Sequence, residues 1–140
     1  MATIFTMIID GDIPGRFVWK DDVCVGFLSI NPMHDGHALV VPRKEVDHWL
    51  DADADLMAHL TKVAQIIGKA QRRAFDPQRI GMMIAGLEVP HLHIHVVPMA
   101  SVHSLDFANA DIDPDPERLD GNAERIRVEL RKMQRIEVAD

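Results

Sequence analysis

Hydrophobic residues in the first part of the chain occur in short runs that end at turn-forming residues. Residues 4–9 are mostly apolar and are compatible with one helical turn or a short strand. Residues 16–20 and 23–30 are rich in β-branched and aromatic side chains, and the two acids between them predict a tight antiparallel hairpin. A third strand is expected over residues 37–41, because Pro42 cannot donate a hydrogen bond to a sheet.

The hydrophobic period lengthens after residue 53 to steps of three and four. This change predicts one amphipathic helix to about residue 75, with apolar positions at Leu56, Leu60, Val63, Ile67, Ala70 and Ala74. Two further strands are expected over residues 80–85 and 91–97. An acidic, proline-containing connector at 111–116 precedes a weaker amphipathic helix, indicated by Ala123, Ile126, Leu130 and Met133. This order predicts an α+β domain, a mostly antiparallel sheet with helices on one face.

The composition supports one domain and excludes several classes of partner. A chain of 140 residues, 47% of them hydrophobic, can bury a single core. The formal charge of -7 offers no broad cationic surface, so we expect no nucleic acid partner. Cys24 is the single cysteine, which excludes an internal disulfide framework. No apolar run is long enough to span a membrane and no signal segment is evident, so we expect a cytoplasmic protein without a membrane partner.

The segment from His91 to Val97 alternates imidazole and aliphatic side chains. Alternate residues of a strand point to opposite faces, so His91, His93 and His95 are expected on one face, with neighbours roughly 6.5 to 7 Å apart. At that spacing all three side chains can reach one small anionic group.

Three interpretations of this row of histidines are open. The residues can be half-buried and purely structural, although a row of three has little packing value. They can ligate a metal ion, with a further ligand supplied by Glu88, His37 or His103. Alternatively, one neutral imidazole can attack phosphorus while its neighbours donate hydrogen bonds to phosphate oxygens, because the pKa of histidine lies near working pH.

The segment resembles the signature of the histidine triad family, in which three alternating histidines are followed by two hydrophobic residues. The resemblance covers roughly residues 3–98, with further matching segments at 11–14, 21–22, 27–32 and 36–42. It implies a five-stranded antiparallel sheet with one long helix and a C-terminal helix, paired in a homodimer that continues the sheet. Residues 1–105 are then the histidine triad domain, and residues 106–140 are a connector and helix of the same domain.

The resemblance also implies a reaction and the residues that perform it. The family's usual chemistry is hydrolysis or transfer at the α-phosphorus of purine nucleotide conjugates, such as phosphoramidates, aminoacyl adenylates or dinucleotide polyphosphates. The reaction proceeds through a covalent nucleotidyl-histidine and needs no cofactor or metal. His93 matches the nucleophile. His91 and His95 match residues that orient it and contact the phosphate and leaving group, and His37 matches a fourth, supporting histidine.

The same resemblance places a nucleotide pocket. The matched positions are Ile4, Phe5, Ile8, Phe27, Ser29 and Ile30, together with Gly86, Leu87 and Glu88 of the loop before the triad. Ser29 stands where an acid usually binds the ribose. The loop itself is short and lacks the usual asparagine and glutamine, so either its backbone amides contact the phosphate or the substrate differs.

Three positions near the triad also depart from the family pattern. Thr3 and Thr6 stand where many bacterial members have a zinc-binding Cys-x-x-Cys, and Glu45 replaces a histidine ligand. The resemblance therefore implies no structural zinc. Two alternatives to the hydrolase remain: a nucleotide-binding or scaffold dimer that has lost catalysis with its shortened loop, and a metallohydrolase that uses the triad as ligands.

Overall fold

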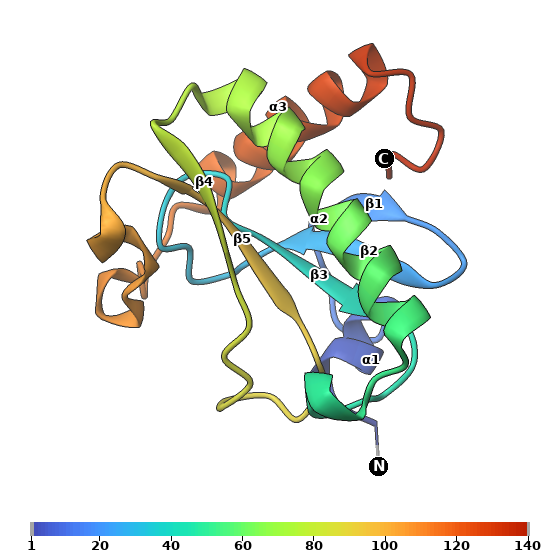
Figure 1. Ribbon diagram of the computed structural model, residues 1–140. Coiled ribbons are helices and arrows are strands. Elements are labelled where there is room, and N and C mark those ends of the chain that lie inside the picture. The colour runs from blue at the N-terminus through green and yellow to red at the C-terminus, as the bar shows by residue number, and fades with distance from the viewer. Residues whose placement is uncertain (1, 140) are drawn as a thin grey trace.

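A five-stranded sheet forms the centre of the computed structural model, which describes residues 2–139 (Figure 1). The outer limits expected for the domain, residues 1 and 140, lie outside the described residues. The strand order is β1-β2-β3-β5-β4, and all neighbouring strands are antiparallel, which confirms the expected α+β fold. The helices and strands in chain order are α1 (Ile4–Ile9), β1 (Phe17–Lys20), β2 (Cys24–Leu28), β3 (Ala38–Pro42), α2 (Ala54–Phe75), β4 (Arg79–Met83), β5 (Ile94–Met99) and α3 (Pro116–Lys132).

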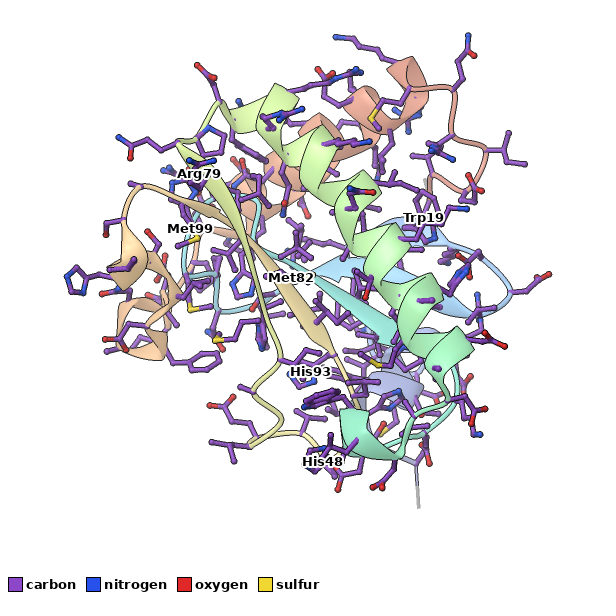
Figure 2. The ribbon with its side chains drawn as sticks, viewed as in Figure 1. Trp19, His48, Arg79, Met82, His93 and Met99 are labelled. Carbon is purple, nitrogen blue, oxygen red and sulfur yellow. The ribbon has the colours of Figure 1, made fainter. Side chains whose placement is uncertain are left out.

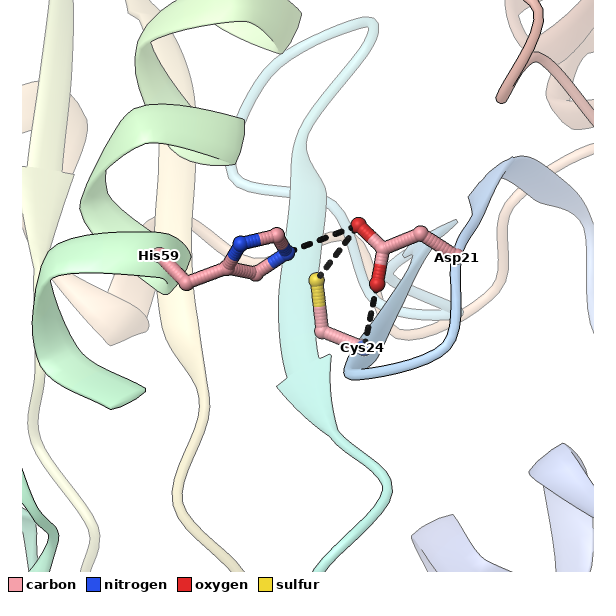
Figure 3. Close-up of side chains that lie close together, drawn as sticks. All are labelled: Asp21, Cys24 and His59. Carbon is pink, nitrogen blue, oxygen red and sulfur yellow. Dashed lines mark hydrogen bonds and ion pairs between the residues drawn. The ribbon is translucent and has the colours of Figure 1, made fainter. Parts of the chain in front are cut away.

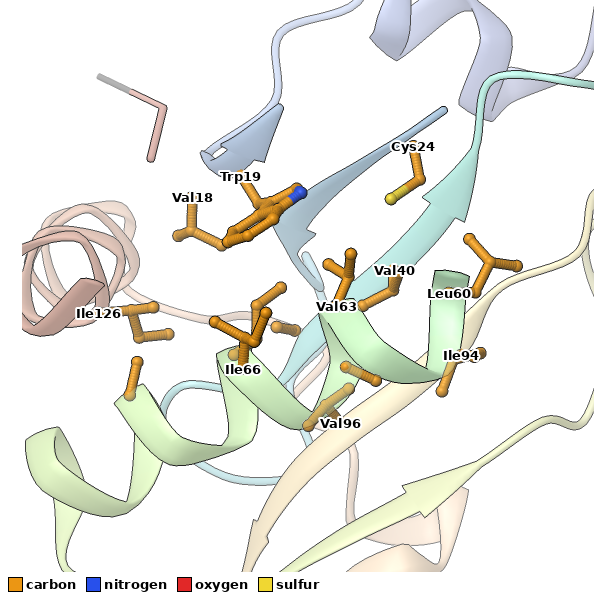
Figure 4. Close-up of a cluster of buried hydrophobic side chains, with 14 of the residues drawn as sticks. Val18, Trp19, Cys24, Val40, Leu60, Val63, Ile66, Ile94, Val96 and Ile126 are labelled. Atoms are coloured by element: carbon orange, nitrogen blue, oxygen red, sulfur yellow. The ribbon is translucent and has the colours of Figure 1, made fainter. Parts of the chain in front are cut away.

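The two faces of the sheet bury different side chains, because successive residues of a strand point in opposite directions. On β3, Ala38 and Val40 belong to the core beneath α2, whereas Leu39 and Val41 belong to the cluster around α1. Figure 4 shows part of the larger core, in which α2 and α3 pack on the sheet. The smaller cluster on the opposite face consists of Phe5, Ile8, Val25, Phe27, Leu39 and Val41.

Helix α2 agrees with the hydrophobic pattern from end to end. Asp53 precedes it, and Asp76 ends it in a left-handed conformation with φ of 47°. The buried amide of Gln71 donates to the carbonyls of Gly36 and Val96 at 2.9 and 2.8 Å, which ties the helix to β5. Among residues 2–139, no helix has both the length and the apolar character that crossing a bilayer requires.

Two expectations about the helices are corrected by the structure. The helices do not all share one face, because the apolar residues of α1 pack against the side of the sheet opposite α2. The last helix also begins at Pro116, inside the expected connector. Asp115 accepts a hydrogen bond from the amide of Glu117, and proline is well suited to the first turn of a helix.

The fifth strand is shorter than the histidine alternation predicts. It begins at Ile94 rather than His91, so only His95 of the three histidines lies in a regular strand. The ladder between β3 and β5 runs from Ala38 opposite Val96 to Val40 opposite Ile94. Beyond it β3 soon reaches Pro42, which has no amide proton, and the pairing stops.

The structure confirms the predicted β1–β2 hairpin, and Asp21 anchors it. One carboxylate oxygen accepts the amides of Val23 and Cys24, and the other accepts the indole of Trp19 and the ring of His59 on α2, all at 2.8 Å. Figure 3 shows the bonds that Asp21 makes with Cys24 and His59. Burial opposes the charged form of Asp21, but these hydrogen bonds lower its pKa to about 2. The carboxylate therefore joins the hairpin to α2.

Candidate active site around His93

The three histidines of the triad segment share one side of the chain, as the alternation predicts. Their neighbours Leu92 and Ile94 are buried in the core beneath α2. The imidazoles lie on the opposite side, where the ring centroids of His93 and His95 are 4.9 Å apart. His37 from the start of β3 joins them, with its ring centroid 5.1 Å from that of His95. The sequence-predicted catalytic residues therefore lie together.

A chain of hydrogen bonds determines the tautomers of His37 and His95. The amide of Met33 can only donate, so Nδ1 of His37 accepts from it at 3.0 Å. In the neutral ring the proton of His37 is then on Nε2, which donates to Nδ1 of His95 at 2.9 Å. The remaining proton of neutral His95 is consequently on its own Nε2, where it can be donated to a ligand.

His93 is held in the complementary tautomer. Its Nδ1 donates to the carbonyl of His91 at 2.8 Å, because a carbonyl can only accept. This leaves the lone pair on Nε2 of a neutral ring. Burial lowers the pKa of His93 below its usual 6.5, although the bond to the carbonyl acts in the opposite direction. The ring is therefore neutral, and nucleophilic, at neutral pH.

The two neighbouring imidazoles are also held neutral. Burial and the nearby ring of His95 lower the pKa of His37 to about 3. Burial, with a smaller contribution from His93, lowers the pKa of His95 to about 4. Desolvation disfavours the charged form, and no carboxylate partner is bonded to either ring among the described residues. The site thus contains three neutral imidazoles in contact.

His91 occupies a different environment from the other members of the triad. It is fully buried, and its Nε2 donates to the carbonyl of Pro42 at 2.7 Å. Its Nδ1 is 2.6 Å from the hydroxyl of Thr3. His91 does not line the cavity described next, and its hydrogen bond with His93 is made by its backbone carbonyl.

A cavity of about 390 Å³ opens beside His37, His93 and His95. It brings together most of the predicted nucleotide-binding residues, namely Ile4, Phe5, Ile8, Phe27, Ser29, Ile30 and Glu88. Phe5 packs edge-on to His93 with ring centroids 4.9 Å apart. The apolar floor and the imidazoles therefore belong to one concave site.

Gly86 and Leu87 lie outside this cavity. They line a second, smaller cavity of about 190 Å³ with Asp47, His48, Trp49, Ile84, Ala85, Leu92 and His93. Gly86 adopts a positive φ of 74°, a conformation that glycine accepts without strain, and the chain turns there from β4 towards the triad. His93 and His48 are both visible at this end of the molecule in Figure 2. Of the described residues, His93 alone lines both cavities.

The structure adds site residues that the sequence pattern missed. Phe107, Ala110 and Ile112 line the larger cavity, and the centroid of the Phe107 ring lies 5.3 Å from that of His95. These residues lie in segment 106–115, which precedes α3 and includes the acidic run, and which we call the connector from here on. The connector is attached where Asp111 donates its amide to the carbonyl of Pro32 at 2.9 Å. Large apolar residues within an acidic segment were the available signal.

Within the described part of the chain, the triad histidines do not bring three possible metal-ligand atoms within 4.8 Å of one another. His37 and His95 are hydrogen-bonded to each other, and His93 is bonded to a carbonyl. Among residues 2–139, the one group of three Cys, His or acidic residues with ligand atoms within 4.8 Å of one another is Asp21, Cys24 and His59. That group contains no triad histidine. Burial also raises the pKa of the Cys24 thiol, and the Asp21 carboxylate is occupied by the donors described above.

Comparison with known proteins agrees with this geometry. The family model of the HIT domain matches residues 10–102. The chain belongs to the histidine triad (HIT) family. An uncharacterised HIT-like protein of Methanocaldococcus jannaschii is 35% identical over 99 residues, which cover 68% of this chain and 77% of the relative. The adenylylsulfatase HINT3 of Arabidopsis thaliana is 26% identical over 100 residues, 68% of this chain and 51% of the relative, so the HIT family includes hydrolases.

Solved structures of other HIT proteins share the fold. A Hit-like protein from Bartonella henselae superposes with a TM-score of 0.81 at 33% identity, covering 91% of this chain and 96% of that one. A Zn-bound histidine triad family protein from Mycobacterium smegmatis also has a TM-score of 0.81, at 26% identity and 96% coverage of both chains. Both likenesses extend beyond the part of the chain that the HIT domain model matches.

Proposed function

We propose that this HIT protein is a hydrolase or nucleotidyl transferase that acts at the α-phosphorus of purine nucleotide conjugates, with His93 as the nucleophile. One observation supports the proposal most directly. His93 offers an unprotonated Nε2 and is the one described residue that lines both the larger and the smaller cavity. A phosphorus atom held at this nitrogen would have the nucleoside on one side and the leaving group on the other.

The larger cavity suits a nucleoside. Phe5 and Phe27 are almost fully buried and form an apolar floor, while Ile4 and Ile30, 46% and 65% exposed, form its rim. A flat purine base can bury its faces between such side chains. Ser29 is positioned at the same rim and offers one hydroxyl for the ribose.

The chemical step follows from the two tautomers. Nε2 of His93 attacks phosphorus, a P–N bond forms, and the bond from phosphorus to the leaving group breaks with its electron pair remaining on that group. The Nε2 proton of His95 can donate a hydrogen bond to the charge that develops there. Water then attacks the phosphorus of the nucleotidyl-histidine and a P–O bond forms, while the P–N bond breaks with its electron pair returning to Nε2 of His93. The water gives up a proton to solvent, and the nucleoside monophosphate is released.

Substitution of the nucleophile tests this proposal. His93→Ala should abolish turnover of aminoacyl adenylates, phosphoramidates and dinucleotide polyphosphates, since no other group replaces Nε2. Rapid quenching of the parent enzyme with substrate should reveal a nucleotidyl mass on the peptide that contains His93. His103→Ala, at an exposed histidine outside both cavities, is the matched control. Turnover that survives in His93→Ala would refute the mechanism.

A nucleotide-binding protein without catalysis is the second candidate, and Glu88 favours it. This carboxylate lines the larger cavity from the shortened loop, where its negative charge would repel a phosphate. Calorimetry with the same nucleotides separates the two candidates. Binding without turnover across the substrate panel supports the second, and turnover supports the first. If Glu88 is the obstacle, Glu88→Gln should tighten nucleotide binding.

We also propose that β4 extends the sheet across a homodimer. The β1 edge is covered by the C-terminal residues, since Ala139 donates its amide to Val18 at 3.1 Å. β4 forms the other edge and carries Met82, labelled in Figure 2. The side chain of Met82 is 54% exposed. Exposed strand edges favour pairing with another chain. Sedimentation should give a dimer for the parent and a monomer for Met82→Lys, with Ile136→Lys as the control; a monomeric parent would contradict the proposal.

A further inference from the structure

Four side chains converge beside the buried histidine His91, and we call them the Thr3–His91 clasp: Thr3, Thr6, Glu45 and His91. The hydroxyl of Thr3 is 2.6 Å from Nδ1 of His91. One carboxylate oxygen of Glu45 accepts the hydroxyl of Thr6 at 2.6 Å and the amide of Thr3 at 3.0 Å. The clasp thus joins the start of α1, the segment after β3 and the first histidine of the triad.

The directions of these hydrogen bonds are consistent throughout the clasp. Nε2 of His91 must donate to the carbonyl of Pro42, so in the neutral ring Nδ1 accepts, and the hydroxyl of Thr3 is its donor. The same Thr3 oxygen accepts the amide of Thr6 and so caps α1. The hydroxyl proton of Thr6 is directed to Glu45, whose pKa is lowered by this bond. The hydroxyl of Thr3 also lies 3.3 Å from the hydroxyl of Thr6, a longer contact than its 2.6 Å distance to Nδ1 of His91.

A zinc ion does not fit this set of side chains. Zinc prefers thiolate, imidazole and carboxylate ligands. Here two of the four side chains are neutral hydroxyls, and both ring nitrogens of His91 are occupied by hydrogen bonds.

We propose that the Thr3–His91 clasp holds the triad in place without a metal, and that Thr3 and Glu45 are positioning residues for His93. The connection to His93 is direct, because the carbonyl of His91 accepts its Nδ1 proton. It is also steric, because Phe5 of the capped helix packs on the rings of both His91 and His93, with centroids 5.8 and 4.9 Å away. Movement of α1 or His91 would misdirect Nε2 of His93. The catalytic part of this inference rests on the proposed function.

The clasp itself can be tested without any activity. Nε2–H of His91 is buried, so its proton should give a slowly exchanging imidazole signal in NMR spectra. Thr3→Val removes the hydroxyl and should accelerate this exchange about tenfold or more. Thr3→Ser keeps the hydroxyl and should leave the exchange rate close to that of the parent. Thr61→Val, on the exposed face of α2, is the matched control. Equal exchange in Thr3→Val and the parent would overturn the clasp.

A second pair of variants tests Glu45, the acceptor at the other end of the clasp. Glu45→Leu removes the acceptor and should also accelerate exchange at His91, whereas Glu45→Gln keeps an oxygen acceptor and should not. If the proposed reaction occurs, Thr3→Val and Glu45→Leu should lower kcat about tenfold with KM little changed, as supporting residues of a site do. A parent enzyme without turnover but with the expected exchange would refute the proposed function and leave the clasp intact.

Zinc supplies the decisive contrast. Dialysis of the parent against a chelator should leave the His91 signal and the melting temperature unchanged. The triple variant Thr3→Cys/Thr6→Cys/Glu45→His, which places two thiols and an imidazole beside His91, should bind one zinc per chain and melt higher with zinc. Stoichiometric zinc in the parent, with loss of the signal on chelation, would overturn the proposal. Failure of the triple variant to bind zinc would contradict the convergence of the four side chains.

Discussion

The two faces of the sheet are built from the same strands but differ in what they bury: one face packs a hydrophobic core, and the other carries the histidines of the candidate site. On β5, Ile94 and Val96 point into the core beneath α2, while His95 between them points to the cavity. The α2 face is closed by aliphatic side chains, and it supplies most of the hydrophobic stabilisation. The α1 face buries imidazoles, and each of these rings makes at least one hydrogen bond that offsets part of the cost of burial. Strand alternation thus separates stability from chemistry residue by residue.

The strongest way to break this comparison is to exchange a single side chain on each face. Ile94→Ala should lower the free energy of unfolding by about 2 to 5 kcal/mol, because Ile94 is 1% exposed and its truncation leaves a cavity. Urea unfolding measures the change, with Ile136→Ala, 93% exposed, as the control. His95→Ala, one residue away, should cost turnover far more than stability. A larger loss of unfolding free energy in His95→Ala than in Ile94→Ala would contradict the separation of stability on the α2 face from chemistry on the α1 face.

Acidification should affect the histidine face before it affects the carboxylates. The folded protein resists protonation of His37 and His95, whose pKa values are lowered from 6.5 to about 3 and about 4, whereas the unfolded chain takes up protons from pH 6.5 downward. Stability is therefore complete above pH 6.5 and falls as the pH drops towards 4, by up to about 1.4 kcal/mol per histidine and pH unit.

Unfolding measurements at several pH values check this window. The depressed pKa values of Asp21, Asp35 and Glu45 add losses of stability only below their usual values of 3.8 to 4.5, so the interval above pH 4.5 reports on the histidines. The double variant with asparagine at positions 37 and 95 should flatten the slope there. An unchanged slope would mean that these two imidazoles titrate normally in the folded state.

The smallest expected effect tests whether the connector belongs to the candidate site on the α1 face. Phe107→Ala removes the connector ring that packs edge-on to His95 and lines the cavity. If the proposed nucleotide site is right, this change should weaken nucleotide binding by about two- to tenfold, in line with about 0.5 to 1.5 kcal/mol for an aromatic pair. Calorimetry measures the change, and Val102→Ala, 80% exposed, is the control. An equal effect of both substitutions would remove the connector from the site.

Much of the fold could be predicted from hydrophobic periodicity. The long helix was expected at residues 53–75 and lies at Ala54–Phe75, because its apolar stripe and its ends are encoded locally. The hairpin was equally clear from its two acids. The fifth strand was extended too far, since its start depends on Pro42 of another strand. The last helix starts earlier in the chain than its apolar positions predict, because Asp115 and Pro116 form a helix start signal within an acidic run.

For the candidate site, the sequence by itself determined which residues are able to act. Histidines at alternate positions share one side of an extended chain whatever surrounds them, since the alternation is a property of the backbone. Only the tertiary structure decided their division of labour. Thr3, Met33 and Pro42 are distant in sequence from the triad, yet they supply the donor or the carbonyl that selects the tautomers of His91, of His37 and, through His37, of His95. The tautomer of His93 alone among these four is set locally, by the carbonyl of His91. A ring nitrogen's role depends on its partner in space, and that partner is known only once the chain has folded.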